Sequence, residues 1–227
     1  MRLFWKKLNR YFDRFLIVVL VIPLLIVSWY VYDSYYVFNH TGEHDLMQFK
    51  PGVHSADAGT GKEILPEMIG WVTLDGTTVD YPIMQAPDNI RFLNMDPFGD
   101  YSLAGSIFLD CRNDPQFNDD YSLIYGHHME YGRMFGALDA FIDPAYLWQH
   151  TTGTLYIGRD GEVQRPLEVF AALQVSAGDK EIFDPTLNQV RQFVSARIDT
   201  ELRSEPILAL STCSDEEARI IVLCYQK

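Results

Sequence analysis

Residues 69–84 read IGWVTLDGTTVDYPIM, in which two apolar runs flank an Asp75-Gly76 turn signal. An Asp-Gly pair between such runs is typical of a β-hairpin. Six more runs rich in Ile, Val, Tyr and Phe follow: GSIFL (105–109), YSLIYG (121–126), TLYIG (154–158), LEVFAALQ (167–174), ILALST (207–212) and RIIVLCY (219–225). Such residues favour strands, so the sequence predicts about eight strands.

Helical patterns are fewer than strand patterns. The segment GRMFGALDAF (132–141) and the segment 185–198 are both expected to be helical, and residues 44–49 suggest a short helix. In the second segment apolar residues recur at spacings of three and four, which is typical of an amphipathic helix: Leu187, Val190, Val194 and Ile198. Many short strands with few helices indicate a mainly β protein, a closed or nearly closed barrel with peripheral helices.

The N-terminal segment has the composition of a membrane anchor. Residues 15–32, FLIVVLVIPLLIVSWYVY, carry no charge and end in aromatic residues, as expected at a membrane interface. A basic cluster precedes them, which predicts a cytoplasmic N-terminus and an extracellular remainder. A cleaved signal peptide is the alternative, but it would place small residues where these aromatics stand.

These observations predict four segments along the 227 residues. Residues 1–14 form a cytoplasmic basic segment and residues 15–32 a transmembrane helix. Residues 33–62 form a stalk with a helical region, and residues 63–227 form the barrel domain. We expect the protein in the cell membrane, crossing it once.

Charge is distributed unevenly between these segments. The formal net charge is -13, and five basic residues against Asp13 give the first 32 residues +4, which leaves -17 for the rest. Nucleic-acid binding requires basic surface, so we expect no nucleic-acid partner. Asp114, Asp119 and Asp120 form an acidic cluster that could bind calcium, but a solvated loop is the simpler interpretation, and no metal site is predicted.

The chain contains three cysteines, Cys111, Cys213 and Cys224. An odd number outside the cytoplasm leaves at least one thiol free or paired with another chain. Cys111 follows one strand-like run and Cys224 lies inside another, and both are interpreted as packing residues. Cys213, at the end of the run LSTC, is therefore the candidate reactive thiol.

Three segments carry residues suited to acyl transfer. His127 and His128 follow a strand-like run, Cys213 ends another, and Arg219 begins the last. A thiol nucleophile requires a nearby base or a stabilised thiolate, which a histidine supplies. An acyl intermediate requires fixed donors for its oxyanion, which an arginine supplies. Each residue taken singly also has an ordinary structural interpretation, as a loop histidine, a buried cysteine or a solvated arginine.

The same segments resemble those of the class B sortases, cysteine transpeptidases of Gram-positive bacteria. LSTC followed by an arginine resembles the sortase cysteine and arginine motif, and LIYGHHM with MFGAL resembles the class B histidine segment. DNIRFLNMD followed by GSIFLD resembles a further class B stretch. The resemblance runs from Gly70 to Tyr225. Only SDEEA separates Cys213 from Arg219, fewer residues than in some class B enzymes, so the sorting signal is not indicated.

The resemblance implies roles for individual residues. Cys213 matches the nucleophile, His127 the catalytic histidine and Arg219 the catalytic arginine. Three further residues match positions expected to bind the substrate: Asn89, Ser211 and Thr212. No cofactor is implied.

The resemblance also implies a reaction and its partners. The cysteine of a sortase attacks the threonine carbonyl of a C-terminal sorting signal, LPxTG- or NPxTN-like, on a surface protein or pilin. The acyl group then passes to an amine of a cell-wall precursor or to a pilin lysine. Two alternatives remain. A papain-like peptidase usually has its cysteine before its histidine, whereas His127 precedes Cys213 here. A non-catalytic extracellular binding module would bury an inert Cys213.

Overall fold

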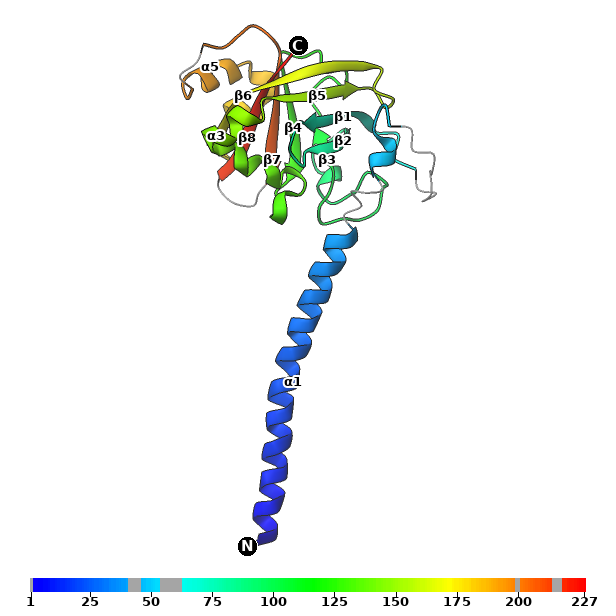
Figure 1. Ribbon diagram of the computed structural model, residues 1–227, viewed down its shortest axis with the longest axis vertical. Helices are drawn as coiled ribbons and strands as arrows, with labels where there is room; N and C mark the ends of the chain where they lie inside the picture. Colours follow the sequence, from blue (N-terminus) through cyan, green and yellow to red (C-terminus); the bar gives the residue numbers. More distant parts are fainter. Residues whose placement is uncertain (1, 41–45, 54–62, 199–200, 214–217) are drawn as a thin grey trace. The chain divides into compact units, whose positions relative to one another are not determined.

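The computed structural model describes residues 2–40, 46–53, 63–198, 201–213 and 218–227. The chain divides into two compact units, Met1–Gly42 and Glu43–Lys227. The first unit contains one helix and the second contains all the strands (Figure 1).

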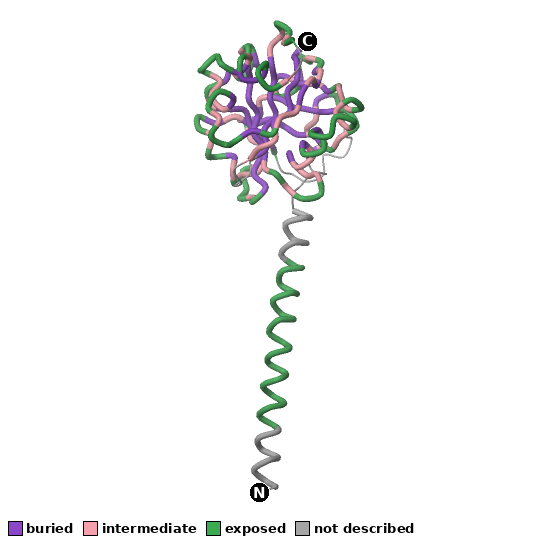
Figure 2. The backbone as a smooth tube through the Cα atoms, turned by 90° about the vertical axis from the view of Figure 1, so that its left-hand side faces the viewer, coloured by how far each residue is buried: buried purple, intermediate pink, exposed green. Residues whose placement is uncertain are grey.

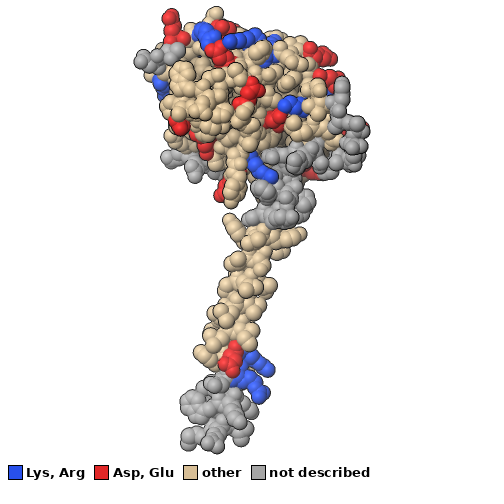
Figure 3. Space-filling view, in the orientation of Figure 1, with Lys and Arg blue, Asp and Glu red and all other residues tan. Residues whose placement is uncertain are grey.

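The first unit is the helix α1 (Arg2–His40). Its segment Arg10–Tyr32 has 23 residues, and an 18-residue window within it has a mean hydropathy of 2.6, so it is long and apolar enough to cross a membrane. This segment is exposed to solvent along its length (Figure 2), and Figure 3 shows a long uncharged stretch on it. The helix continues to His40, into the segment expected to be a stalk, because no glycine or proline interrupts residues 33–41.

The second unit is a closed barrel of eight strands in the order β1-β2-β3-β4-β7-β8-β6-β5. The eight predicted strands are thereby confirmed. Their bounds are β1 (Met68–Leu74), β2 (Asp80–Met84), β3 (Ile107–Leu109), β4 (Tyr121–His127), β5 (Thr152–Ile157), β6 (Val163–Ser176), β7 (Ile207–Cys213) and β8 (Ala218–Gln226). The hairpin predicted around Asp75-Gly76 is the antiparallel pair β1 and β2.

Two strand pairs are parallel, β2 with β3 and β4 with β7. Strands β4 and β7 are far apart in the sequence, and the chain between them supplies β5, β6 and the longer helices of the second unit. The parallel pairing matters for function because it aligns the C-terminal ends of β4 and β7 at one edge.

The helices of the second unit are short. They are η1 (Met47–Phe49), η2 (Arg91–Leu93), η3 (Glu130–Gly132), η4 (Phe135–Ile142), α3 (Pro144–Gln149), α4 (Lys180–Phe183), η5 (Pro185–Leu187) and α5 (Val190–Ser195). Of the short helix expected at 44–49, the described residues show Leu46 as helical and η1 after it, and residues 44 and 45 lie outside the described residues.

The two longer predicted helices differ from expectation. The helix expected at 132–141 is a 3-10 helix that begins at Phe135, because Met134 has a φ of 49° and cannot continue a helix. The prediction of a single helix over 185–198 is wrong. Asn188 adopts the left-handed conformation with a φ of 55°, which separates η5 from α5.

Apolar side chains form two clusters on opposite faces of the barrel wall. One cluster takes residues from all eight strands and fills the inside: Val72, Ile83, Leu109, Ile124, Leu155, Leu167, Leu210 and Val222. The other lies on the outside, where the segments around η2 and α5 cover it: Trp71, Phe92, Phe108, Tyr125, Val190, Phe193, Ala209 and Leu223. Successive residues of a strand alternate between the two clusters.

Candidate active site

The strands β4, β7 and β8 lie side by side in the barrel (Figure 1) and carry the three candidate catalytic residues. In the parallel register of β4 and β7, His127 is the partner of Cys213, and both end their strands. In the antiparallel register of β7 and β8, Ser211 is the partner of Ile221. Continued by two residues, this register brings position 219 opposite position 213. Backbone pairing thus gathers the three residues at one edge.

His127 and Arg219 belong to the outer face of the barrel. Leu123 and Tyr125 of β4 lie in the outer cluster, as do Ile221 and other alternate residues of β8. His127 and Arg219 continue these two rows, because side chains of a strand repeat every second residue. Both residues are partly exposed, unlike the buried members of these rows, so solvent reaches this end of the strands.

A hydrogen bond fixes the imidazole of His127. Its Nε2 lies 2.7 Å from the carbonyl oxygen of Leu93. A carbonyl oxygen only accepts hydrogen bonds, so Nε2 must carry a hydrogen and donate it. Nδ1 is then the ring nitrogen free of this bond and the one available to take up and release protons.

The carbonyl of Leu93 is itself held rigidly. Gly105 has a φ of +60°, and a Cβ at this position would lie 2.5 Å from the carbonyl oxygens of both Phe92 and Leu93. The backbone N–H of Ser106 donates to the carbonyl oxygen of Phe92 at 2.9 Å, and its hydroxyl donates to that of Met95 at 2.7 Å. This close packing, which only glycine permits at position 105, keeps the acceptor of His127 in place.

Gly126, just before His127, allows β4 to pass close to its neighbours. A Cβ at this position would lie 2.4 Å from Cδ1 of Ile107 and 2.7 Å from the ring of Phe135. A larger residue would therefore displace the end of β4 and with it the imidazole.

His128 lies in a different environment from His127. Its Nε2 is 2.6 Å from Oδ2 of Asp139 in η4, and both side chains are exposed. Its backbone forms an isolated bridge with Met134. The two adjacent histidines thus have separate partners, and His127 is the one paired in register with Cys213.

Arg219 has unused hydrogen-bonding capacity. Its Nε is buried and has no hydrogen-bond partner in the part of the chain that the structure describes. Its Cζ lies 5.2 Å from the centre of the Phe183 ring. A buried donor without a partner is costly, and this N–H can still take an acceptor from outside the described residues.

Asn89 is part of a partly buried polar network around Asp110. Its amide nitrogen donates to Asp110 at 3.0 Å, and its amide oxygen accepts from the backbone N–H of Cys111 at 2.8 Å. Asp110 also accepts two hydrogen bonds from the guanidinium of Arg112, one from its backbone N–H and one from the hydroxyl of Tyr125. Burial alone would raise the pKa of Asp110, but the hydrogen bonds from Arg112 keep it below its usual range.

Ser211 and Thr212 are buried beside the end of β7. The hydroxyl of Ser211 donates to the carbonyl oxygen of Thr212 at 3.2 Å, and the hydroxyl of Thr212 accepts from the backbone N–H of Ile220 at 3.1 Å. Direct contact of these two side chains, or of Asn89, with a substrate stays a prediction.

The three cysteines occupy different positions. Cys213 ends β7, and its side chain lies outside the described residues. Cys224 is fully buried in the inner cluster, and burial raises the pKa of its thiol to about 12, so it is not a nucleophile near neutral pH. Cys111 is half-buried and free.

The acidic loop before β4 is held by its own hydrogen bonds. Oδ2 of Asp119 accepts from the side-chain amide of Asn113 at 2.8 Å and from the backbone N–H of Asp114 at 2.7 Å. Asp114 accepts from the backbone N–H of Gln116 at 3.0 Å. Two of the carboxylates thus close this loop.

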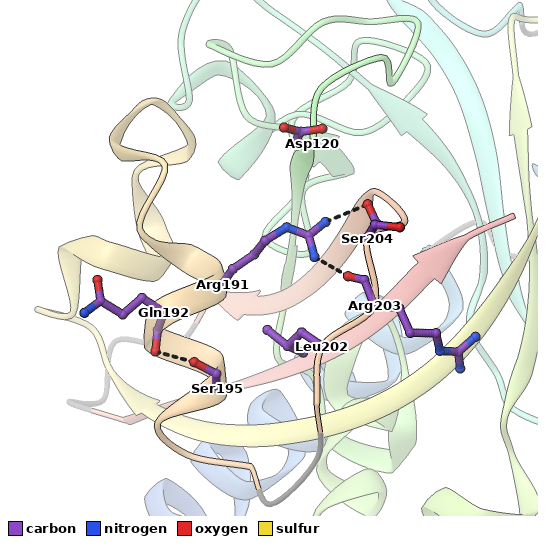
Figure 4. Close-up of a pocket in the computed structure, with 7 residues that line it drawn as sticks. All are labelled: Asp120, Arg191, Gln192, Ser195, Leu202, Arg203 and Ser204. Carbon is purple, nitrogen blue, oxygen red and sulfur yellow. Dashed lines mark hydrogen bonds between the residues drawn. The ribbon is translucent and has the colours of Figure 1, made fainter.

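A pocket of about 630 Å³ lies between α5 and the segment before β7 (Figure 4). The guanidinium of Arg191 points into this region and donates to the backbone carbonyls of Arg203, Ser204 and Glu205. Because these carbonyls occupy it, Arg191 serves to fasten the segment to α5.

Comparison with known proteins identifies the family. Residues 72–227 match the family model of the sortase domain. The chain belongs to the sortase family. This sortase is 26% identical over 234 aligned positions to Sortase B of Listeria monocytogenes, with 93% of each chain covered.

Solved structures place the sortase in class B. A class B sortase of Streptococcus pyogenes involved in pilus biogenesis is 33% identical, with a TM-score of 0.64 over 71% of this chain and 92% of that one. A Staphylococcus aureus sortase B–substrate complex is 26% identical, with a TM-score of 0.62 over 72% and 81%. The protein is therefore a cysteine transpeptidase of class B type, not a papain-like peptidase or a non-catalytic module.

Sequence reasoning missed two residues at this site, Leu93 and Phe183. Leu93 acts through its backbone carbonyl, which leaves no signature in the residue type. Phe183 lies in the charged stretch DKEIFD (179–184), for which the sequence pattern predicted no element. The only available signal for Leu93 was its place inside the stretch DNIRFLNMD, which resembles class B sortases.

Proposed function

We propose that this sortase is a membrane-anchored transpeptidase that forms a thioester at Cys213. It cleaves a C-terminal sorting signal of the LPxTG or NPxTN kind and transfers the acyl group to an amine of a cell-wall precursor or a pilin. The observation that carries this proposal is the parallel register that pairs Cys213 with His127, with Arg219 on the adjoining strand.

In the first half-reaction the thiolate of Cys213 attacks the threonine carbonyl carbon of the sorting signal. The carbonyl oxygen becomes an oxyanion, which accepts hydrogen bonds from Arg219. The C–N bond then breaks, and the departing amine takes a proton from His127 through Nδ1. The products are a thioester and a released C-terminal peptide.

In the second half-reaction an acceptor amine attacks the thioester and gives a proton to Nδ1 of His127. The C–S bond breaks, a new amide forms and the thiolate is restored, so atoms and charge balance over the cycle. Two structural relatives are linked to pili: a class B sortase of Streptococcus pyogenes involved in pilus biogenesis, and a sortase B from the Type II pilus of Streptococcus pneumoniae. They support a pilin amine as one of the two acceptors.

Three residues are proposed to line the substrate groove: Asn89, Ser211 and Thr212. Their support is the match of the sequence to class B positions and their place beside the ends of β3 and β7. Because both Asn89 amide atoms are engaged, it contributes by shaping the groove through Asp110 and Cys111.

The helix α1 is proposed to anchor the enzyme with its N-terminus in the cytoplasm and the barrel outside. Deleting residues 1–32 should give a soluble protein that still cleaves a sorting-signal peptide, because both apolar clusters lie in the second unit. Cleavage of internally quenched LPxTG and NPxTN peptides measures this. A folded but inactive product would show that the helix or the membrane takes part in catalysis.

Selective reactivity of Cys213 tests the proposed nucleophile. A short exposure of the full chain to iodoacetamide, followed by mass spectrometry, should modify Cys213 first and Cys224 last, because a buried neutral thiol is inert. A Cys111→Ser variant removes the other free thiol as a control. Equal modification of Cys213 and Cys224 would be incompatible with an activated nucleophile.

A further inference from the structure

The aromatic ring of Phe183 lies against the guanidinium of Arg219. Its Cζ lies 5.2 Å from the centre of the Phe183 ring, inside the distance of about 6 Å at which a cation is attracted to a ring face. Among the described residues, no carboxylate interacts with Arg219, and its Nε has no hydrogen-bond partner.

This mode of holding keeps the donors of the arginine available. A carboxylate partner would accept the N–H groups along the edge of the planar guanidinium. A ring face instead attracts the flat side of the guanidinium and leaves the N–H groups at its edge unused. An arginine that must donate to an oxyanion benefits from the second arrangement.

The backbone around Phe183 is fixed from the barrel side. Nη2 of Arg112 donates to the carbonyl oxygen of Phe183 at 2.8 Å. The hydroxyl of Tyr121 donates to the carbonyl oxygen of Ile182 at 2.8 Å and is buried. Side chains of other segments thus bind two consecutive carbonyls of α4. A helix this short is unstable in isolation, and these hydrogen bonds hold it in place.

Arg112 is in turn held by two carboxylates. It donates to both oxygens of Asp110, at 2.8 and 2.7 Å, and Nη1 lies 3.0 Å from Asp184. Asp110 is fully buried, which makes this a charge pair with little exposure to water on the carboxylate side. Tyr121 and Tyr125, which bind this network, belong to β4, the strand that ends at His127. The ring is thereby tied to the strand of the catalytic histidine.

We propose that Phe183 is a positioning residue for catalysis. Its ring holds the guanidinium of Arg219 so that the N–H groups point at the oxyanion, while the Asp110–Arg112 pair fixes the ring. This inference deepens the proposed function and rests on the role of Arg219 given there.

The test compares Phe183→Leu with Phe183→Tyr in the full chain in detergent micelles. The probes are the internally quenched LPxTG and NPxTN peptides. Phe183→Leu keeps an apolar side chain, though a smaller one, and removes the ring. It should lower kcat about tenfold with little change in KM, because the lost interaction acts on the transition state. Phe183→Tyr keeps the ring face and should restore most of the turnover. Iodoacetamide should modify Cys213 at the wild-type rate in both.

Phe193→Leu is the matched control for a loss of stability. Cζ of Arg197 lies 3.4 Å from the centre of the Phe193 ring, and Phe193 is more buried than Phe183. The same exchange there removes an equivalent contact away from the candidate catalytic residues. It should lower Tm at least as much as Phe183→Leu and leave kcat within about twofold of wild type.

A double-mutant cycle with Arg219→Gln decides whether the ring acts through the arginine. Phe183→Leu should lower kcat about tenfold in the wild-type background. In the Arg219→Gln background it should change kcat little, because the cation is already absent. An equal cost in both backgrounds, or a Phe183→Tyr variant as slow as Phe183→Leu, would overturn the proposal. So would a fall in kcat for Phe193→Leu that matches Phe183→Leu. If Arg219→Gln itself kept full activity, the role of Arg219 in the proposed function would fail instead.

Discussion

Replacing His127 by alanine should abolish turnover, whereas replacing His128 should leave most of it. His127 is the last residue of β4, whereas His128 lies beyond the strand, in an isolated bridge with Met134. His127 is paired in register with Cys213 and has its Nε2 bound to the carbonyl of Leu93, which leaves Nδ1 for proton transfer. His128 is bound to Asp139 in η4 instead. Without His127 the departing amine has no acid, and a general acid or base typically contributes about 10²- to 10⁴-fold.

Turnover of the sorting-signal peptides by each variant measures this difference. Asp139→Asn serves as a control, because it weakens the bond to His128 without touching His127. It should therefore behave like His128→Ala. If His128→Ala were inactive and His127→Ala active, the histidine chosen here would be the wrong one.

The strands of this protein could be predicted from its sequence because runs of β-branched and aromatic residues are bounded by turn residues. The segment 69–84 has β-branched and aromatic runs and an Asp-Gly turn, and the structure pairs its two halves as β1 and β2. Their order around the barrel could not be read. The neighbours β4 and β7 are separated by about a third of the chain, and periodicity within a run says nothing of its partner.

The helix over 185–198 failed for a local reason. Val190 and Val194 have helical spacing and are buried, as expected, but Asn188 takes a left-handed conformation that interrupts the helix. Asparagine adopts this conformation more readily than most residues. The spacing of apolar residues does not detect such a break, so the periodic segment is longer than the helix that forms.

The candidate site also has features that the sequence predicted and features that it did not. The types and order of His127, Cys213 and Arg219 indicated acyl transfer, because side-chain chemistry is visible in a sequence. The features that orient them were not visible. The carbonyl of Leu93 belongs to the backbone, and the ring of Phe183 reaches Arg219 through α4, a helix that the pattern did not predict.

Arg219→Lys should lower turnover by about a hundred- to a thousand-fold, the usual cost of removing one oxyanion donor. If the residue supplied only positive charge, lysine would serve nearly as well. An ammonium lacks the planar fork of a guanidinium and cannot direct the same N–H groups at an oxyanion. It can still lie over the Phe183 ring as a cation, so the expected loss comes from the missing donors and not from the loss of that contact.

The rate at which iodoacetamide modifies Cys213 in Arg219→Lys distinguishes two roles for the arginine. An arginine could act by stabilising the thiolate, in which case modification would slow in step with turnover. If it acts on the oxyanion, modification should continue near the wild-type rate while turnover falls. Among the described residues the buried Nε of Arg219 has no hydrogen-bond partner, so it can still donate to an oxyanion. A parallel fall of both rates would leave the arginine as a group that tunes the nucleophile, and the oxyanion role would be wrong.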